Sequence, residues 1–126
     1  MTDPQTAPVF LNLFRIRFPA GAVASIAHRI SGVLLVLSLP FLAWLLDLSL
    51  QGAEGYERAI ALLQPAWVRL GSVLLAWSLL HHLIAGIRFL LVDIHLGVSM
   101  PAARITAWSA NVTAVLLTLF YAWWVL

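Results

Sequence analysis

The chain has 126 residues, of which 63% are hydrophobic and 10% charged, and its formal net charge is +2. Soluble domains average roughly 45–50% apolar and about 25% charged residues, so this composition excludes an ordinary water-soluble protein. The absence of cysteine excludes disulfides and cysteine-ligated iron–sulfur clusters in this chain, and its seven basic residues form no stretch typical of nucleic-acid binding.

The first 20 residues are mixed in character, with acidic, basic and proline residues among apolar ones. They contain no apolar core of signal-peptide length, so we expect no cleaved signal. They also lack the serine- and arginine-rich, acid-free composition of an organelle transit peptide, which favours a bacterial source.

Three apolar blocks follow, and each approaches or exceeds the roughly 20 residues that cross the hydrocarbon of a bilayer. They predict an all-α integral membrane protein with one domain over residues 1–126. The predicted transmembrane helices cover about residues 22–46, 68–92 and 105–126. Pro40 lies inside the first block, and we expect the helix to continue through it because neighbouring helices can satisfy a freed carbonyl group. Residues 47–67 predict an aqueous loop with one short interfacial helical turn.

The arginines are distributed unevenly between the two sides of the predicted bundle. The side of the N-terminus and the second connection has Arg15, Arg17, Arg29, Arg88 and Arg104, and the other side has Arg58 and Arg69. Basic residues favour the cytoplasmic side of a membrane. We therefore expect a bacterial inner-membrane protein with its N-terminus in the cytoplasm and its C-terminus in the periplasm.

A polar stripe follows one face of the first predicted helix. At about 100° per residue, Ser25, His28, Arg29 and Gly32 share an arc of roughly 100°. An ionisable group in hydrocarbon costs about 2.5–3.5 kcal/mol on insertion scales, so it usually faces protein, water or a cofactor. Arg29 also lies near the helix end, where an arginine can snorkel to lipid headgroups, and the stripe alone leaves both interpretations open.

The adjacent histidines of the second predicted helix face in different directions. His82 shares a face with Gly86, whereas His81 lies about 100° away with Arg88. Gly86 has no side chain and leaves room for a flat porphyrin, so His82 is the better candidate for a haem ligand. The alternative is a hydrogen-bonded histidine between helices. Arg88 is expected to snorkel or to pair with Asp93.

Depth in the membrane adds a second constraint. At ~1.5 Å per residue, Ser25, Arg29 and His82 lie roughly 5, 10 and 16 Å below the cytoplasmic boundary. This spacing suits one haem, with its iron near His82 and its propionates towards the cytoplasm. His28 and Arg29 could pair with those propionates through charge-assisted hydrogen bonds.

Two ordered motifs resemble a known family. The run from Ser25 to Gly32 is similar to the Ser-x-x-His-Arg-x-Ser/Thr-Gly signature of succinate dehydrogenase cytochrome b subunits, and the run from His82 to Arg88 resembles the family's His-x-x-x-Gly-x-Arg signature. The segment 14–19 also resembles the family's entry to the first helix. One departure is Phe89, where many members have a second histidine.

The resemblance implies a membrane-anchor subunit of succinate dehydrogenase, which passes electrons from succinate to quinone in respiration and the tricarboxylic acid cycle. His82 would ligate haem b beside Gly86, and a smaller three-helix anchor subunit would supply the other axial ligand within a heterodimeric bundle. The pair would dock a flavoprotein subunit and an iron–sulfur subunit on the cytoplasmic side. Ser25 and Arg29 carry over to a site for ubiquinone or menaquinone, and His28 and Arg29 to the haem propionates. The chain alone is not expected to oxidise succinate, and none of its residues is expected to be catalytic.

Two other classes of protein remain to be weighed. A non-redox structural subunit of another membrane complex would also have three apolar helices, with His82 and Arg29 as packing or lipid contacts. A transport protein is disfavoured because three helices without paired broken segments offer little for a translocation path. A b-type haem spectrum would distinguish the redox subunit from both.

Overall fold

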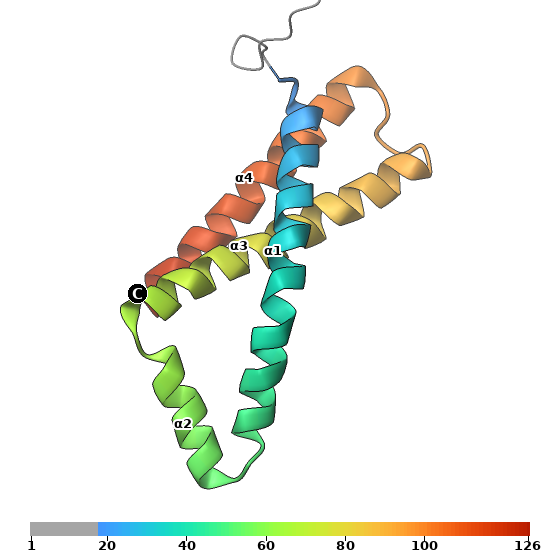
Figure 1. Ribbon diagram of the computed structural model, residues 1–126. Helices are drawn as coiled ribbons and strands as arrows, with labels where there is room; N and C mark the ends of the chain where they lie inside the picture. Colours follow the sequence, from blue (N-terminus) through green and yellow to red (C-terminus); the bar gives the residue numbers. More distant parts are fainter. Residues whose placement is uncertain (1–17) are drawn as a thin grey trace, which may run out of the picture.

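The computed structural model describes residues 18–126, which form α-helices joined by short connections and contain no strand within that range (Figure 1). The helices are α1 (Ala20–Ser49), α2 (Ala53–Leu63), α3 (Ala66–Asp93) and α4 (Met100–Val125). Of these, α1, α3 and α4 are long and apolar enough to cross a membrane. The predicted all-α membrane fold with three spans is therefore confirmed.

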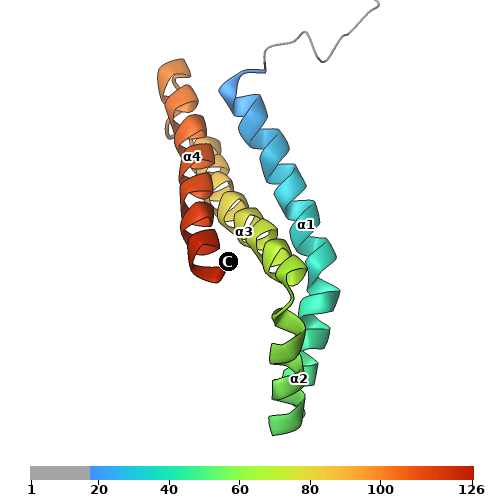
Figure 2. The same cartoon turned by 90° about the vertical axis from the view of Figure 1, so that its left-hand side faces the viewer.

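Small residues fill the contacts between the spans. α1 packs against α3, and α3 packs against α4, so that α3 lies between the other two spans (Figure 2). The beginning of α1 also contacts α4 through a buried cluster of Ala20, Ala24 and Ala107. The face of α4 that is buried has Ala110, Ala114 and further small side chains. Small side chains let helix backbones approach closely, which is how helices associate in lipid, where there is little hydrophobic driving force between them. The large apolar side chains point outward and remain exposed, as expected for contact with lipid.

The connection over residues 47–67 differs from the predicted loop, because it contains the 11-residue helix α2. Gly52 allows the turn before α2 with a φ of 89°, a conformation that other residues rarely adopt. A Cβ atom at Gly55 would collide with the carbonyl oxygen of Leu48, so glycine lets α2 pack directly against the end of α1. The exposed face of α2 has the ion pair between Arg58 and Glu54. The charged residues of α2 are typical of a loop, so the sequence did not predict an 11-residue helix here.

α4 begins at Met100, earlier than the predicted start near Ile105. Pro101 lies in the first turn, where its missing amide hydrogen leaves no helical bond unmade. The proline therefore starts this helix instead of preceding it, and Arg104 lies inside the helix.

The two ends of the bundle have different elements. One end joins the beginning of α1, the end of α3 and the beginning of α4, and the other joins the end of α1, α2, the beginning of α3 and the C-terminus (Figure 1). At the second end Tyr121 donates a hydrogen bond from its hydroxyl to Ser72 Oγ at 3.1 Å, which fixes the last turns of α4 on the first turns of α3.

Candidate functional site

His28 of α1 and His82 of α3 stack face to face across the helix crossing. Their ring centroids are 4.0 Å apart and their planes differ by 11°. Phe89, two turns further along α3, meets the His28 ring edge-on at 5.2 Å. His82 and Phe89 therefore both lie on the face of α3 that packs on α1.

The hydrogen bonds of His82 determine which of its ring nitrogens carries the proton. Its Nδ1 lies 3.2 Å from the backbone carbonyl oxygen of His28 and 3.3 Å from Ser31 Oγ. The Ser31 hydroxyl donates to the same carbonyl at 2.8 Å. A carbonyl oxygen only accepts, so this contact assigns a proton to Nδ1 of His82, and in the neutral imidazole Nε2 is then the nitrogen with the lone pair.

The bond from Nδ1 of His82 to a backbone carbonyl oxygen is an arrangement common among metal-binding histidines. Metal-binding histidines almost always donate their second ring N–H to a carbonyl, a carboxylate or water, which fixes both the tautomer and the ring orientation. In the described part of the chain no side chain or backbone group bonds to Nε2 of His82. No group of three or more potential metal-binding side chains occurs within residues 18–126.

Two glycines line this pair of histidines. A Cβ atom built on Gly32 would lie 2.9 Å from Cε1 of His82, closer than side-chain contacts allow, so Gly32 makes room for the His82 ring. A Cβ atom on Gly86 would lie 3.4 Å from Nε2 of His28. In this structure the imidazole of His28 therefore lies beside Gly86, in the space that the sequence analysis expected a porphyrin to occupy.

His81 lies on a different face of α3 from His82, as the 100° separation predicted. It is 2% exposed, and its Nε2 lies 2.9 Å from Oδ1 of Asn111 on α4. Its Nδ1 and the Nδ2 of Asn111 are buried and have no hydrogen-bond partner among the described residues. Trp77, one turn earlier, packs against the same ring at 5.4 Å. His81 therefore joins α3 to α4, and the two adjacent histidines have separate surroundings.

Ser25 and Arg29 lie one turn apart on α1, next to the turn that contains His28. Ser25 is partly buried and Arg29 is exposed. Within residues 18–126 neither side chain forms a hydrogen bond or an ion pair. Both groups therefore lie on the first turns of α1 without a bond to the described residues, and Ser25 is the more buried of the two.

Of the two alternatives expected for Arg88, snorkelling or pairing with Asp93, the ion pair with Asp93 does not occur among the described residues. The Nε of Arg88 donates to Thr106 Oγ1 at 3.1 Å and its Nη2 to the carbonyl oxygen of Ala103 at 3.0 Å. Both partners belong to the first turns of α4, and Ala103 lies before the start that the sequence predicted for this helix. The face of α3 that has His81 and Arg88 therefore packs on α4.

The sequence matches a family described as the succinate dehydrogenase/fumarate reductase transmembrane subunit over residues 3–121. The chain belongs to this family. It is 35% identical over 119 residues to the succinate dehydrogenase cytochrome b556 subunit of Coxiella burnetii, a match that covers 94% of this chain and 95% of the relative. It is 31% identical over 109 residues to the subunit of the same name from Rickettsia felis, covering 86% and 83%.

Membership in the succinate dehydrogenase/fumarate reductase transmembrane-subunit family confirms the predicted resemblance. The chain is thus a multi-pass membrane subunit of an oxidoreductase complex. Both motifs that carried the resemblance lie in the described helices. The segment 14–19 also carried the resemblance. Its residues 14–17, which include Arg15 and Arg17, lie outside the described residues.

Sequence reasoning did not assign a role to two residues that shape the site. Ser31 was noted only as part of a motif, although its position three residues after His28 places its hydroxyl within reach of the His28 carbonyl group. Asn111 was not noted, although its polar amide side chain lies within an uncharged and mostly apolar block.

Proposed function

We propose that this chain is a membrane-anchor subunit of succinate dehydrogenase that binds haem b through His82 and forms part of a quinone site through Ser25 and Arg29. Its assignment to succinate dehydrogenase is supported by its similarity to two succinate dehydrogenase cytochrome b556 subunits. The observation that carries the haem assignment is the bond from Nδ1 of His82 to the His28 carbonyl, because it leaves Nε2 as the metal-binding nitrogen.

The residues around His82 fit this cofactor. Haem b, when bound, can take up and release one electron. Gly32 admits the His82 ring, and the carbonyl of His28 holds its orientation. A smaller anchor subunit would supply the second axial ligand. Haem beside Gly86 requires the His28 imidazole to leave its stack on His82, which suits a role for His28 and Arg29 in pairing with the propionates.

The quinone site rests on the first turns of α1. Measured from Ala20, Ser25 and Arg29 lie about 7 and 13 Å along the helix axis at ~1.5 Å per residue. A serine hydroxyl can donate to a quinone carbonyl, and a guanidinium favours the negative charge that develops on that oxygen during reduction. Because Ser25 is only partly buried and Arg29 is exposed, other subunits would form the remaining walls for ubiquinone or menaquinone.

The rest of the complex would include an iron–sulfur subunit and a flavoprotein subunit. These would dock at the end of the bundle where α1 begins, so that electrons from succinate reach the quinone near Ser25. Arg29, Arg88 and Arg104 belong to this end, which favours its placement in the cytoplasm, with the C-terminus in the periplasm of a bacterial inner membrane.

Purification through a tag on this chain tests the proposal. We expect a flavoprotein, an iron–sulfur protein and a second small membrane protein to copurify. The preparation should show a reducible b-type haem spectrum and should reduce quinone with succinate. A complex with neither haem nor a flavoprotein would instead support a non-redox structural subunit.

A further inference from the structure

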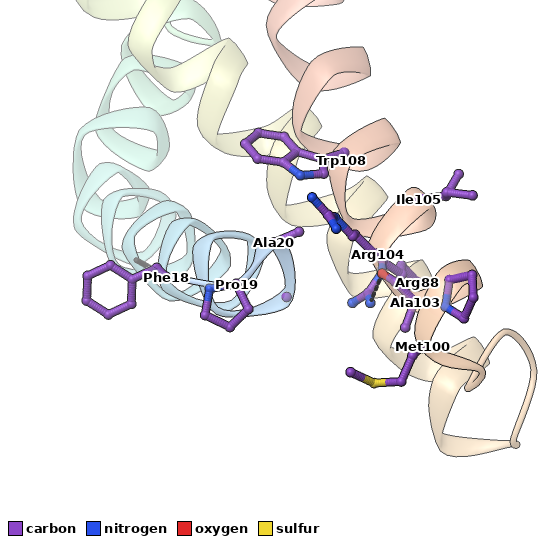
Figure 3. A pocket seen from close by; sticks show the side chains of 11 residues that line it. Phe18, Pro19, Ala20, Arg88, Met100, Ala103, Arg104, Ile105 and Trp108 are labelled. Carbon is purple, nitrogen blue, oxygen red and sulfur yellow. Dashed lines mark hydrogen bonds between the residues drawn. The ribbon is translucent and has the colours of Figure 1, made fainter. Parts of the chain in front are cut away.

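A hollow of about 950 Å³ lies at the end of the bundle where α1 and α4 begin (Figure 3). Phe18 and the first residues of α1 form one wall, and Ile105 and Trp108 of α4 form another. Arg88 of α3 and Arg104 of α4 also line it. This hollow is separate from the contact between His28 and His82, and none of the proposed haem or quinone residues lines it.

The lining of the hollow is positively charged. Among residues 18–126 it includes two arginines and no acidic residue. The starts of α1 and α4 both border it, and neither start has a side-chain cap or an acidic residue in its first turn. The partial positive charge of each helix start therefore adds to that of the guanidinium groups. Together these charges favour an anion.

Arg88 is already oriented for such a ligand. Two of the five N–H groups of its guanidinium donate hydrogen bonds to Thr106 and Ala103. These two bonds fix the orientation of the guanidinium plane. The remaining N–H groups are available to a ligand. Arg104 is exposed, and the structure gives it no partner among the described side chains.

The apolar part of the lining indicates what kind of anion fits. Ile105 is 67% exposed and Trp108 is 49% exposed, and both are on a helix that can cross a membrane. Arg104 is about 6 Å from the beginning of α4 and Arg88 about 7 Å from the end of α3 at ~1.5 Å per residue. The charges thus lie at headgroup level, where tryptophan is also enriched, with apolar side chains next to them.

We propose that this hollow binds an anionic phospholipid, with the phosphate against Arg88 and Arg104 and an acyl chain along Ile105 and Trp108. Free phosphate would leave the apolar wall uncovered. A zwitterionic choline lipid would bring a cation close to two arginines. An anionic phospholipid matches both the charge and the apolar surface.

Lipid retention by the intact complex tests this site. The complex, purified through a tag on this chain, would be equilibrated in detergent with equal amounts of phosphatidylglycerol and phosphatidylcholine, and the bound lipid measured by mass spectrometry. We expect phosphatidylglycerol to be retained preferentially. Arg104→Gln should lower its retention roughly tenfold because a charge-assisted hydrogen bond is lost, and Arg104→Lys should keep most of it.

Arg58→Gln is the matched control, because Arg58 is exposed on α2, at the other end of the bundle. It should not change lipid retention. Trp108→Ala tests the apolar wall independently and should also lower retention. Unchanged retention of phosphatidylglycerol in both Arg104→Gln and Trp108→Ala would overturn the proposal.

A photoreactive amino acid in place of Ile105 identifies the occupant directly. We expect it to label phospholipid in the assembled complex. Cross-linking to another subunit or to residues 1–17 of this chain would show that protein covers the hollow, and would also overturn the proposal.

Discussion

Nδ1 of His82 lies 3.2 Å from the backbone carbonyl oxygen of His28, a residue 54 positions earlier in the chain. This bond fixes the tautomer of His82, and it does so through backbone that no side-chain substitution at position 28 removes. The α1 backbone therefore orients the proposed haem ligand, and this bond does not involve the His28 side chain.

His82→Ala should remove or strongly weaken haem binding, whereas His81→Ala should mostly retain it. The physical reason is that His82 lies on the α1 side with no bond to its Nε2 among residues 18–126, while His81 is buried against Asn111 on the α4 side. Reduced-minus-oxidised absorbance spectra of the purified complexes measure this. Haem loss in the His81 variant, with a full low-spin spectrum in the His82 variant, would reverse the assignment.

Gly32→Ala should disturb the haem spectrum without replacing any ligand. The new methyl group would lie 2.9 Å from Cε1 of His82, so the ring or the helix must move. Gly71→Ala is the control, since a Cβ atom there meets nothing within 4 Å. A shift of the haem midpoint potential or a reduced haem content is expected in the first variant alone, and equal behaviour of the two would count against a positioning role for Gly32.

Ser25→Ala should slow quinone reduction by roughly ten- to a hundredfold, because losing one hydrogen bond in a water-poor site costs about 1–3 kcal/mol. Arg29→Leu should be more damaging. Steady-state rates with quinone and with an artificial acceptor that takes electrons earlier would separate the effects. The artificial-acceptor rate should survive in both variants, and its parallel loss would indicate failed assembly. Unchanged quinone kinetics in an assembled Ser25→Ala complex would remove Ser25 from the site.

Asn111→Leu should lower the stability of the complex by about 1–3 kcal/mol, because it leaves the buried Nε2 of His81 without its partner. The double variant His81→Leu with Asn111→Leu should recover much of that loss, since no buried polar group is then left unpaired. Thermal unfolding followed through helix content provides the comparison. Strictly additive losses would show that the pair contributes no coupling.

A reporter fused to the N-terminus should be active in the cytoplasm, and one fused to the C-terminus should be active in the periplasm. The reason is the excess of arginines at the end where α1 begins, combined with three membrane-crossing helices. A C-terminal reporter active only in the cytoplasm would contradict this topology and would move Ser25 away from the proposed docking side.

The sequence by itself determined the properties that depend on local chain geometry and on solvent preference. Long apolar blocks can satisfy their backbone groups in lipid only as helices, so the three spans and the continuation through Pro40 followed without any knowledge of packing. The separation of His81 from His82 followed in the same way, because adjacent helical residues always differ by about 100°.

Only the tertiary structure decided what each of those faces meets. Periodicity shows that two histidines diverge, but the partners of His82 and His81 come from residues 54 and 30 positions away, and depend on where the helices cross. The same reason explains Arg88, whose guanidinium bonds to α4 instead of the nearby Asp93. Helix crossings are set by the small residues that allow close approach, and a pattern along one chain segment does not contain that information.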